Sequence, residues 1–146
     1  MRKGLNYFLL ILLFSIAGCR NSDSIAERLY SKCGDKQPCR LPLKDVTDFE
    51  WEKVYVFPVG ASLEEIDQTL GFHYKQWEDV GEKIIFVSKG QVVYHEDYFP
   101  YPEMKNGTVR FDLSNSLYVG LYNEAALSVE KQEIEGGKYF YLVKPN

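Results

Sequence analysis

The sequence is poor in the residues and motifs that usually mark an active site. Of its 146 residues, only two are histidines and three are cysteines. It has no HExxH or GxSxG pattern, so it lacks the motifs that identify many zinc peptidases and serine hydrolases. It also has no glycine-rich phosphate loop. The sequence therefore offers no recognisable catalytic set, and it predicts no cofactor and no metal site.

The chain also lacks an apolar run long enough for a membrane-spanning helix, which takes about 20 residues. The longest run, at residues 5–17, is interrupted by Asn6 and Ser15 and follows the basic residues Arg2 and Lys3. A basic flank and a short apolar core are typical of a secretory signal. The N-terminus therefore predicts export.

The run ends in Ile16, Ala17, Gly18 and Cys19, a branched apolar residue and two small residues before a cysteine. In this order they resemble the lipobox of the bacterial lipoprotein family. The resemblance implies cleavage before Cys19, a diacylglyceryl group on its thiol and usually an acyl group on its amine. Two or three such chains hold a protein firmly at a membrane. The alternative is an ordinary secreted protein that is cut after Gly18 and leaves Cys19 unpaired.

The same resemblance implies a location and a division of the chain. In Gram-negative lipoproteins, Asp directly after the cysteine tends to retain the protein at the inner membrane. This chain has Arg20 there, which implies an anchor in the outer membrane, facing the periplasm. We expect a signal peptide at residues 1–18, a lipidated tether at 19–24 and a single domain at 25–146.

Positive charge is scarce in the expected mature chain. Removing residues 1–18 takes away two basic and no acidic residues, which leaves 15 basic against 21 acidic and changes the net charge from −4 to −6. An acidic surface repels phosphate backbones. We therefore expect no nucleic-acid partner.

With Cys19 modified, Cys33 and Cys39 remain, and Gly34 and Pro38 lie in the loop between them. An exported protein meets an oxidising compartment, so the two thiols predict a disulfide rather than free cysteines. Five residues separate them, not the two of a redox motif. A metal site would need further ligands, and no histidine lies near.

The clearest structural signals lie at residues 49–71. Residues 51–57 are rich in aromatic and β-branched side chains, as in a strand. After the break at Pro58 and Gly60, Ser62 and Glu65 form a capping box that predicts the start of a helix. Leu63, Ile66 and Leu70 make an apolar stripe, and Gly71 suits a left-handed C-terminal cap. We expect this helix at residues 63–70 to pack on a sheet.

The remaining pattern predicts an α+β fold: a mostly antiparallel β-sheet of five to seven strands with one main helix on one face. Ser24 and Glu27 form a second capping box, which predicts a short N-terminal helix that packs on the domain or lies against lipid headgroups. The stretch at residues 49–71 is similar to a segment of small bacterial envelope lipoproteins, a resemblance that implies no activity. Further strands are expected at residues 84–87, 91–94, 108–113, 117–122, 125–131 and 138–143.

Two groups of side chains are candidates for function. His95, Glu96 and Asp97 suggest acid–base or metal chemistry, but neighbouring side chains on a strand point to opposite faces, so a surface strand end explains them more simply. Tyr98, Phe99 and Tyr101 form an aromatic, proline-containing segment that suits a partner contact. The same rings would equally cover one end of the sheet.

These observations favour a membrane-anchored, non-enzymatic envelope lipoprotein that binds a protein or cell-wall partner. An alternative is a periplasmic inhibitor or immunity protein, whose acidic surface would attract a basic hydrolase or toxin. An enzyme that uses His95 with nearby carboxylates is a third hypothesis, and it predicts a pocket around His95.

The lipobox resemblance predicts that Cys19→Ser abolishes lipidation. Because serine has no thiol to accept the diacylglyceryl group, the variant should lose metabolic acyl label and leave the detergent phase in a two-phase extraction. The unmodified protein is the control. Acyl label retained on the variant would show that Cys19 is not the lipidated residue.

Overall fold

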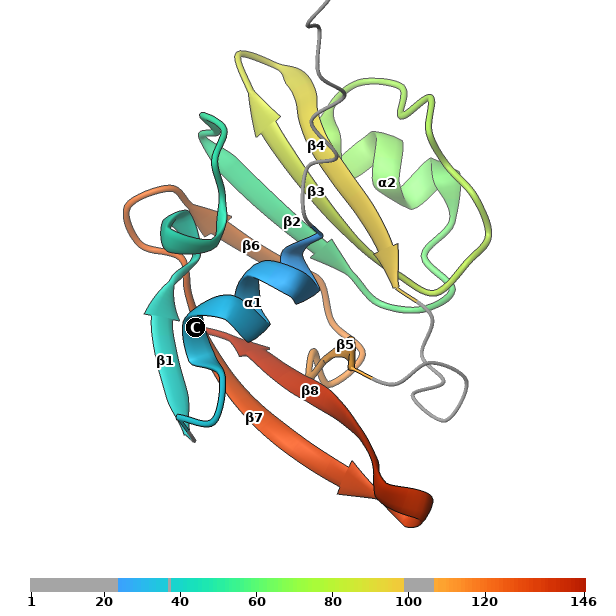
Figure 1. Ribbon diagram of the computed structural model, residues 1–146. Helices are drawn as coiled ribbons and strands as arrows, with labels where there is room; N and C mark the ends of the chain where they lie inside the picture. Colours follow the sequence, from blue (N-terminus) through green and yellow to red (C-terminus); the bar gives the residue numbers. More distant parts are fainter. Residues whose placement is uncertain (1–23, 37, 99–106) are drawn as a thin grey trace, which may run out of the picture.

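The computed structural model describes residues 24–36, 38–98 and 107–146, which form two four-stranded sheets and two α-helices (Figure 1). One sheet, called here the β8 sheet, has the order β1-β7-β8-β5. The other, the β3 sheet, has the order β4-β3-β2-β6. The strands of the β8 sheet are β1 (Cys39–Pro42), β7 (Ala126–Ile134), β8 (Lys138–Pro145) and β5 (Thr108–Phe111). Those of the β3 sheet are β4 (Gln91–Tyr98), β3 (Glu82–Ser88), β2 (Lys53–Phe57) and β6 (Tyr118–Leu121).

The prediction of a mixed, mostly antiparallel fold is confirmed, since β5 and β8 form the single parallel pair among the described strands. The predicted number of strands is wrong, because the described residues contain eight strands in two sheets rather than five to seven in one. The physical reason is that β2 and β3, the central strands of the β3 sheet, are buried on both faces. Each face therefore requires a layer of its own.

Strands β2 and β3 show this two-sided burial directly. Val54, Val56, Ile84 and Phe86 point to one face and join a large core with residues of the β8 sheet. The alternate side chains point to the opposite face, where they form a smaller core with α2 (Leu63–Leu70); these are Tyr55, Phe57, Ile85 and Val87. Because both sets are buried, β2 and β3 lack the polar alternation of a half-exposed strand.

The helix α2 begins and ends as the sequence predicts. The Ser62 hydroxyl accepts a hydrogen bond from the Glu65 N–H at 3.2 Å, and the Glu65 carboxylate accepts one from the Ser62 N–H at 2.8 Å. Gly71 closes the helix in the left-handed conformation. Ile66 is fully buried in the smaller core. Local capping and one apolar anchor thus fix this helix on the sheet.

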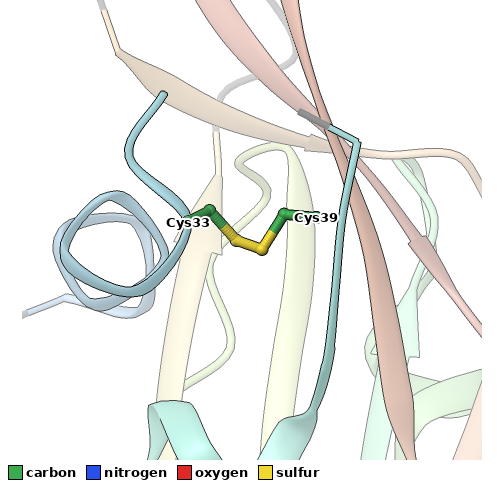
Figure 2. Close-up of a disulfide and its surroundings, with 2 residues drawn as sticks. All are labelled: Cys33 and Cys39. Carbon is green, nitrogen blue, oxygen red and sulfur yellow. A yellow bond between two sulfur atoms is a disulfide. The ribbon is translucent and has the colours of Figure 1, made fainter. Parts of the chain in front are cut away.

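The helix α1 (Ile25–Cys33) starts at the capping box of Ser24 and Glu27 and packs on the large core through Ile25, Leu29 and Cys33. Packing on the domain is therefore the arrangement that the structure shows. The predicted disulfide is confirmed: Cys33 and Cys39 are bonded, with their Cα atoms 5.6 Å apart, and join the end of α1 to the start of β1 (Figure 2).

We expect replacement of Cys33 and Cys39 by alanine to lower the free energy of unfolding by about 2 kcal/mol, because the disulfide restricts the unfolded chain even across a short loop. Urea denaturation of the purified protein measures this change. A reductant should produce a similar loss in the unmodified protein and none in the double variant. Equal midpoints for the two proteins under oxidising conditions would contradict the expectation.

Candidate functional site

The structure places the sequence-predicted site residues in different parts of the molecule. Cys19, Phe99 and Tyr101 lie outside the described residues. Tyr98 is only 7% exposed, its ring stands edge-on to Phe111, and its hydroxyl donates to the Glu96 carboxylate. The prediction that Tyr98 contacts a partner is therefore wrong. The alternative, in which its ring covers the end of the sheet, holds for this residue.

The interpretation of Glu96 as a residue at a surface strand end is also wrong. The strand β4 continues to Tyr98, and the Glu96 carboxylate points inward, where it accepts the Ile25 N–H at 2.9 Å and the hydroxyls of Tyr94 and Tyr98. Burial raises the pKa of Glu96, and the hydrogen bonds from Tyr94 and Ile25 oppose that rise. The carboxylate thus satisfies a free donor at the start of α1 and fastens the helix to the sheet.

His95 lies on the opposite face of β4, as strand alternation predicts. Its ring is edge-on to the buried Tyr74, with centroids 5.9 Å apart. Asp97 forms an ion pair with Lys83, with 3.0 Å between Oδ1 and Nζ. His95 and Glu96 are therefore separated by the sheet, and Asp97 is engaged elsewhere. The structure does not bring the three side chains together as one site.

A pocket of about 540 Å³ opens instead beside Glu82, the first residue of β3. Its walls come from the chain after β2, from β5 and the turn that follows it, and from the neighbouring strands β7 and β8. Its apolar lining residues include Phe111, Leu113, Phe140 and Leu142, and its charged ones are Glu82, Arg110 and Asp112. A concave, partly apolar pocket with a few polar groups is the usual form of a ligand site.

Glu82 is the most unusual residue of this pocket, because its side chain is charged yet the residue is only 6% exposed. Its Oε2 atom accepts the Phe111 N–H at 2.9 Å. Burial raises the pKa of the Glu82 carboxyl, while the Phe111 hydrogen bond and the nearby charge of Arg110 lower it less strongly. Because β5 is the edge strand of its sheet, no further strand accepts a hydrogen bond from the Phe111 N–H. Glu82 accepts this hydrogen bond and so links the two sheets.

The turn after β5 forms the rim of the pocket and has an unusual backbone. Ser114 and Asn115 adopt φ angles of 49° and 58°, a region that costs most non-glycine residues free energy. The turn is closed by the Ser116 N–H, which donates to the Leu113 carbonyl at 2.9 Å. Sparsely populated backbone conformations concentrate at binding sites, so the rim adds to the case for the pocket.

The edge strand β6 forms a second surface of interest. Val119 is 48% exposed and Leu121 is 44% exposed, and Leu117 and Tyr122 beside them are also exposed. The α2 helix covers the β2 and β3 part of this face and leaves the β6 part open. Single exposed apolar residues are ordinary, but a row of them along an edge strand marks an interaction site.

The sequence contained a signal for each of these surfaces. Residues 117–122, LYVGLY, have strong β propensity and no charge, whereas soluble proteins usually place charges along an exposed edge. Glu82 lies two residues before the fully apolar run at residues 84–87. Because a charged residue at a strand end usually faces solvent, its burial could not be predicted without the position of β5.

Comparisons with protein-family models, with curated proteins and with solved structures find no match to this chain. Neither helix of the described residues has the length and apolar character needed to cross a membrane. Within residues 24–36, 38–98 and 107–146, no three His, Cys, Asp or Glu side chains gather as metal ligands. The pocket beside Glu82 and the edge strand β6 are the candidate sites within these residues.

We expect Glu82→Gln to remove a pH dependence of stability. Because the pKa of Glu82 is raised, the folded state holds its proton more tightly than the unfolded state. The free energy of unfolding should therefore fall as pH rises from about 4.5 through the folded-state pKa. Glutamine keeps an acceptor for the Phe111 N–H but does not ionise. The free energy of unfolding of the variant should therefore decline less over this pH range.

Glu82→Ala is the matched control, because it removes both the charge and the acceptor. It should lower the free energy of unfolding by about 1–3 kcal/mol, since the Phe111 N–H loses its partner. Urea denaturation of the three proteins between pH 4.5 and 8 measures both effects. Parallel pH profiles for the unmodified protein and Glu82→Gln would contradict the assignment.

Proposed function

We propose that the protein is a bacterial envelope lipoprotein, anchored through Cys19, that binds a partner protein and has no enzymatic role. The exposed apolar edge strand β6 carries the proposal for binding. The resemblance of Ile16, Ala17, Gly18 and Cys19 to a lipobox supports the anchor. The partner contributes an extended segment that adds a strand to the β3 sheet, a common mode of peptide recognition.

The hydrogen-bond pattern of β6 supports strand addition. The Tyr122 N–H donates to the Glu52 carbonyl at 3.1 Å, and Gly120 is opposite Val54 in the register. Backbone groups alternate in direction along an antiparallel strand. Those of Val119 and Leu121 therefore point away from β2, toward the open edge.

Part of this edge is already occupied. The Leu121 carbonyl accepts hydrogen bonds from the N–H groups of Ala125 at 2.8 Å and Glu124 at 3.0 Å. The groups that remain for a partner are both backbone groups of Val119 and the N–H of Leu121. An added strand is therefore short and centred on Val119, and much of its contact energy comes from apolar side chains over Val119 and Leu121.

An inhibitor or immunity protein against a basic hydrolase or toxin is a more specific form of this proposal. The net charge of −6 expected for the mature chain supports it, because complementary charge speeds encounter with a basic partner. Binding would then weaken and slow as salt concentration rises. Binding that does not depend on salt concentration would argue against an inhibitor or immunity protein, but it would not contradict a contact through β6.

We expect Val119→Lys to abolish partner binding, because a lysine on the open edge opposes strand addition and desolvation of the apolar row. Val93→Lys is the matched control, since Val93 is also exposed, at 42%, but lies on β4 at the other edge of the same sheet. The measurement is affinity capture from envelope extract with each protein, followed by mass spectrometry and by titration of the captured partner.

The proposal requires a partner that the unmodified protein and Val93→Lys bind with similar affinity and that Val119→Lys binds at least about tenfold more weakly. Hydrogen exchange should show added protection of the Val119 and Leu121 amides in the complex. A partner that binds all three proteins equally would place the contact elsewhere.

A further inference from the structure

We infer that the pocket beside Glu82 binds a small zwitterion with an apolar body, such as an α-amino acid or a short peptide. The inference concerns a site distinct from β6 and does not depend on the proposed protein partner. It is carried by two opposite charges that line one pocket together with apolar walls. Glu82 suits the ammonium group of the ligand, Arg110 suits its carboxylate, and the apolar walls suit its side chain.

The carboxylate of Glu82 suits an ammonium group. Its Oε2 atom accepts one backbone N–H, from Phe111, and a carboxylate can accept several hydrogen bonds. None of the basic side chains in the described residues forms an ion pair with it. A bound ammonium would supply the missing positive charge in a poorly solvated position, where charge-assisted hydrogen bonds are strongest.

The guanidinium of Arg110 suits the carboxylate of the same ligand. Arg110 lines the pocket and lies close enough to Glu82 to lower its pKa. It forms no ion pair with any carboxylate in the part of the chain that the structure describes. Because arginine binds carboxylates through two parallel hydrogen bonds, it is well suited to hold the acidic end of a zwitterion.

The charges that line the pocket favour a ligand that carries both signs. A plain anion at Arg110 would meet the negative charges of Glu82 and Asp112, and a plain cation would leave Arg110 without a counter-charge from the ligand. A zwitterion satisfies both groups at once. The volume of about 540 Å³ lies within the range of about 300–1,000 Å³ that is usual for small-molecule sites.

The rest of the pocket suits an apolar side chain between the charged ends. Phe140 is buried although it lies outside both cores, and Leu142 lies two residues along the same strand. Phe111 and Leu113 also line the pocket, although both belong to the large core. An aliphatic or aromatic ligand side chain would displace water from these surfaces and gain the free energy of apolar burial.

The test uses the dipeptide Leu-Leu, its N-acetyl derivative and its C-terminal amide, titrated calorimetrically into the purified protein at pH 7.5. Leu-Leu should bind, and each derivative should bind at least about tenfold more weakly because it lacks one charged end. Titration of free leucine and phenylalanine shows whether a single amino acid is sufficient. Absence of binding by Leu-Leu, leucine and phenylalanine at millimolar concentration would overturn the inference.

Three variants assign the two charges. Glu82→Gln should bind Leu-Leu about tenfold more weakly and lose the preference for a free amine, and Arg110→Gln should lose the preference for a free carboxylate. Arg40→Gln is the control, since Arg40 lies on β1 at the other edge of the same sheet and bonds Ser128 instead. Unchanged affinities in both Glu82→Gln and Arg110→Gln would place any observed binding outside this pocket and overturn the inference.

A second measurement locates the ligand without a variant. Leu-Leu should change the amide NMR signals of Leu113, Ser114 and Asn115 at the rim and leave those of Val119 and Leu121 unchanged. Changes confined to β6 would assign the peptide to the strand edge and overturn the inference for the pocket. This readout also separates the inference from the proposed protein-binding function.

Discussion

The burial of β2 and β3 on both faces is the constraint on which the rest of the structure depends. A strand that is apolar on both sides cannot remain in a single sheet with one face in water, so it requires a layer on each side. Here α2 supplies one layer, and the β8 sheet with α1 supplies the other. The two candidate sites lie where these layers end: the β6 edge beyond α2, and the pocket where β5 meets the start of β3.

Two inward carboxylates join these layers, and both do so by accepting backbone N–H groups. Glu82 accepts from Phe111 of the β8 sheet, and Glu96 accepts from Ile25 of α1. In each case the start of a helix or the edge of a sheet offers a donor that regular secondary structure leaves unpaired. The cost of desolvating a carboxylate explains why the pKa of each is raised. The same arrangement that closes the fold thus creates the charged wall of the pocket.

The features that the sequence predicted well are those set by residues close together in the chain. The capping boxes of Ser62 with Glu65 and of Ser24 with Glu27, and the Cys33–Cys39 bond, all follow from local spacing. The contact of Glu82 with Phe111 and the parallel pairing of β5 with β8 join residues 29 or more positions apart. No local pattern specifies such pairs, which is why the two-sheet architecture and the pocket were missed. The apolar run at residues 84–87 predicted a strand, but a local pattern does not show which layers cover it.

The attachments of α1 also determine how the domain bears a pulling force. Tension applied to the chain ahead of Ser24 reaches the Ile25–Glu96 hydrogen bond first, at the start of the helix. If the helix is pulled away from the core, the Cys33–Cys39 bond transfers the load to β1 before the intervening loop can extend. The strand β1 is paired with β7 along its whole length in the opposite direction. A pull from the N-terminal side is therefore distributed over the β8 sheet and is not borne by α1 alone.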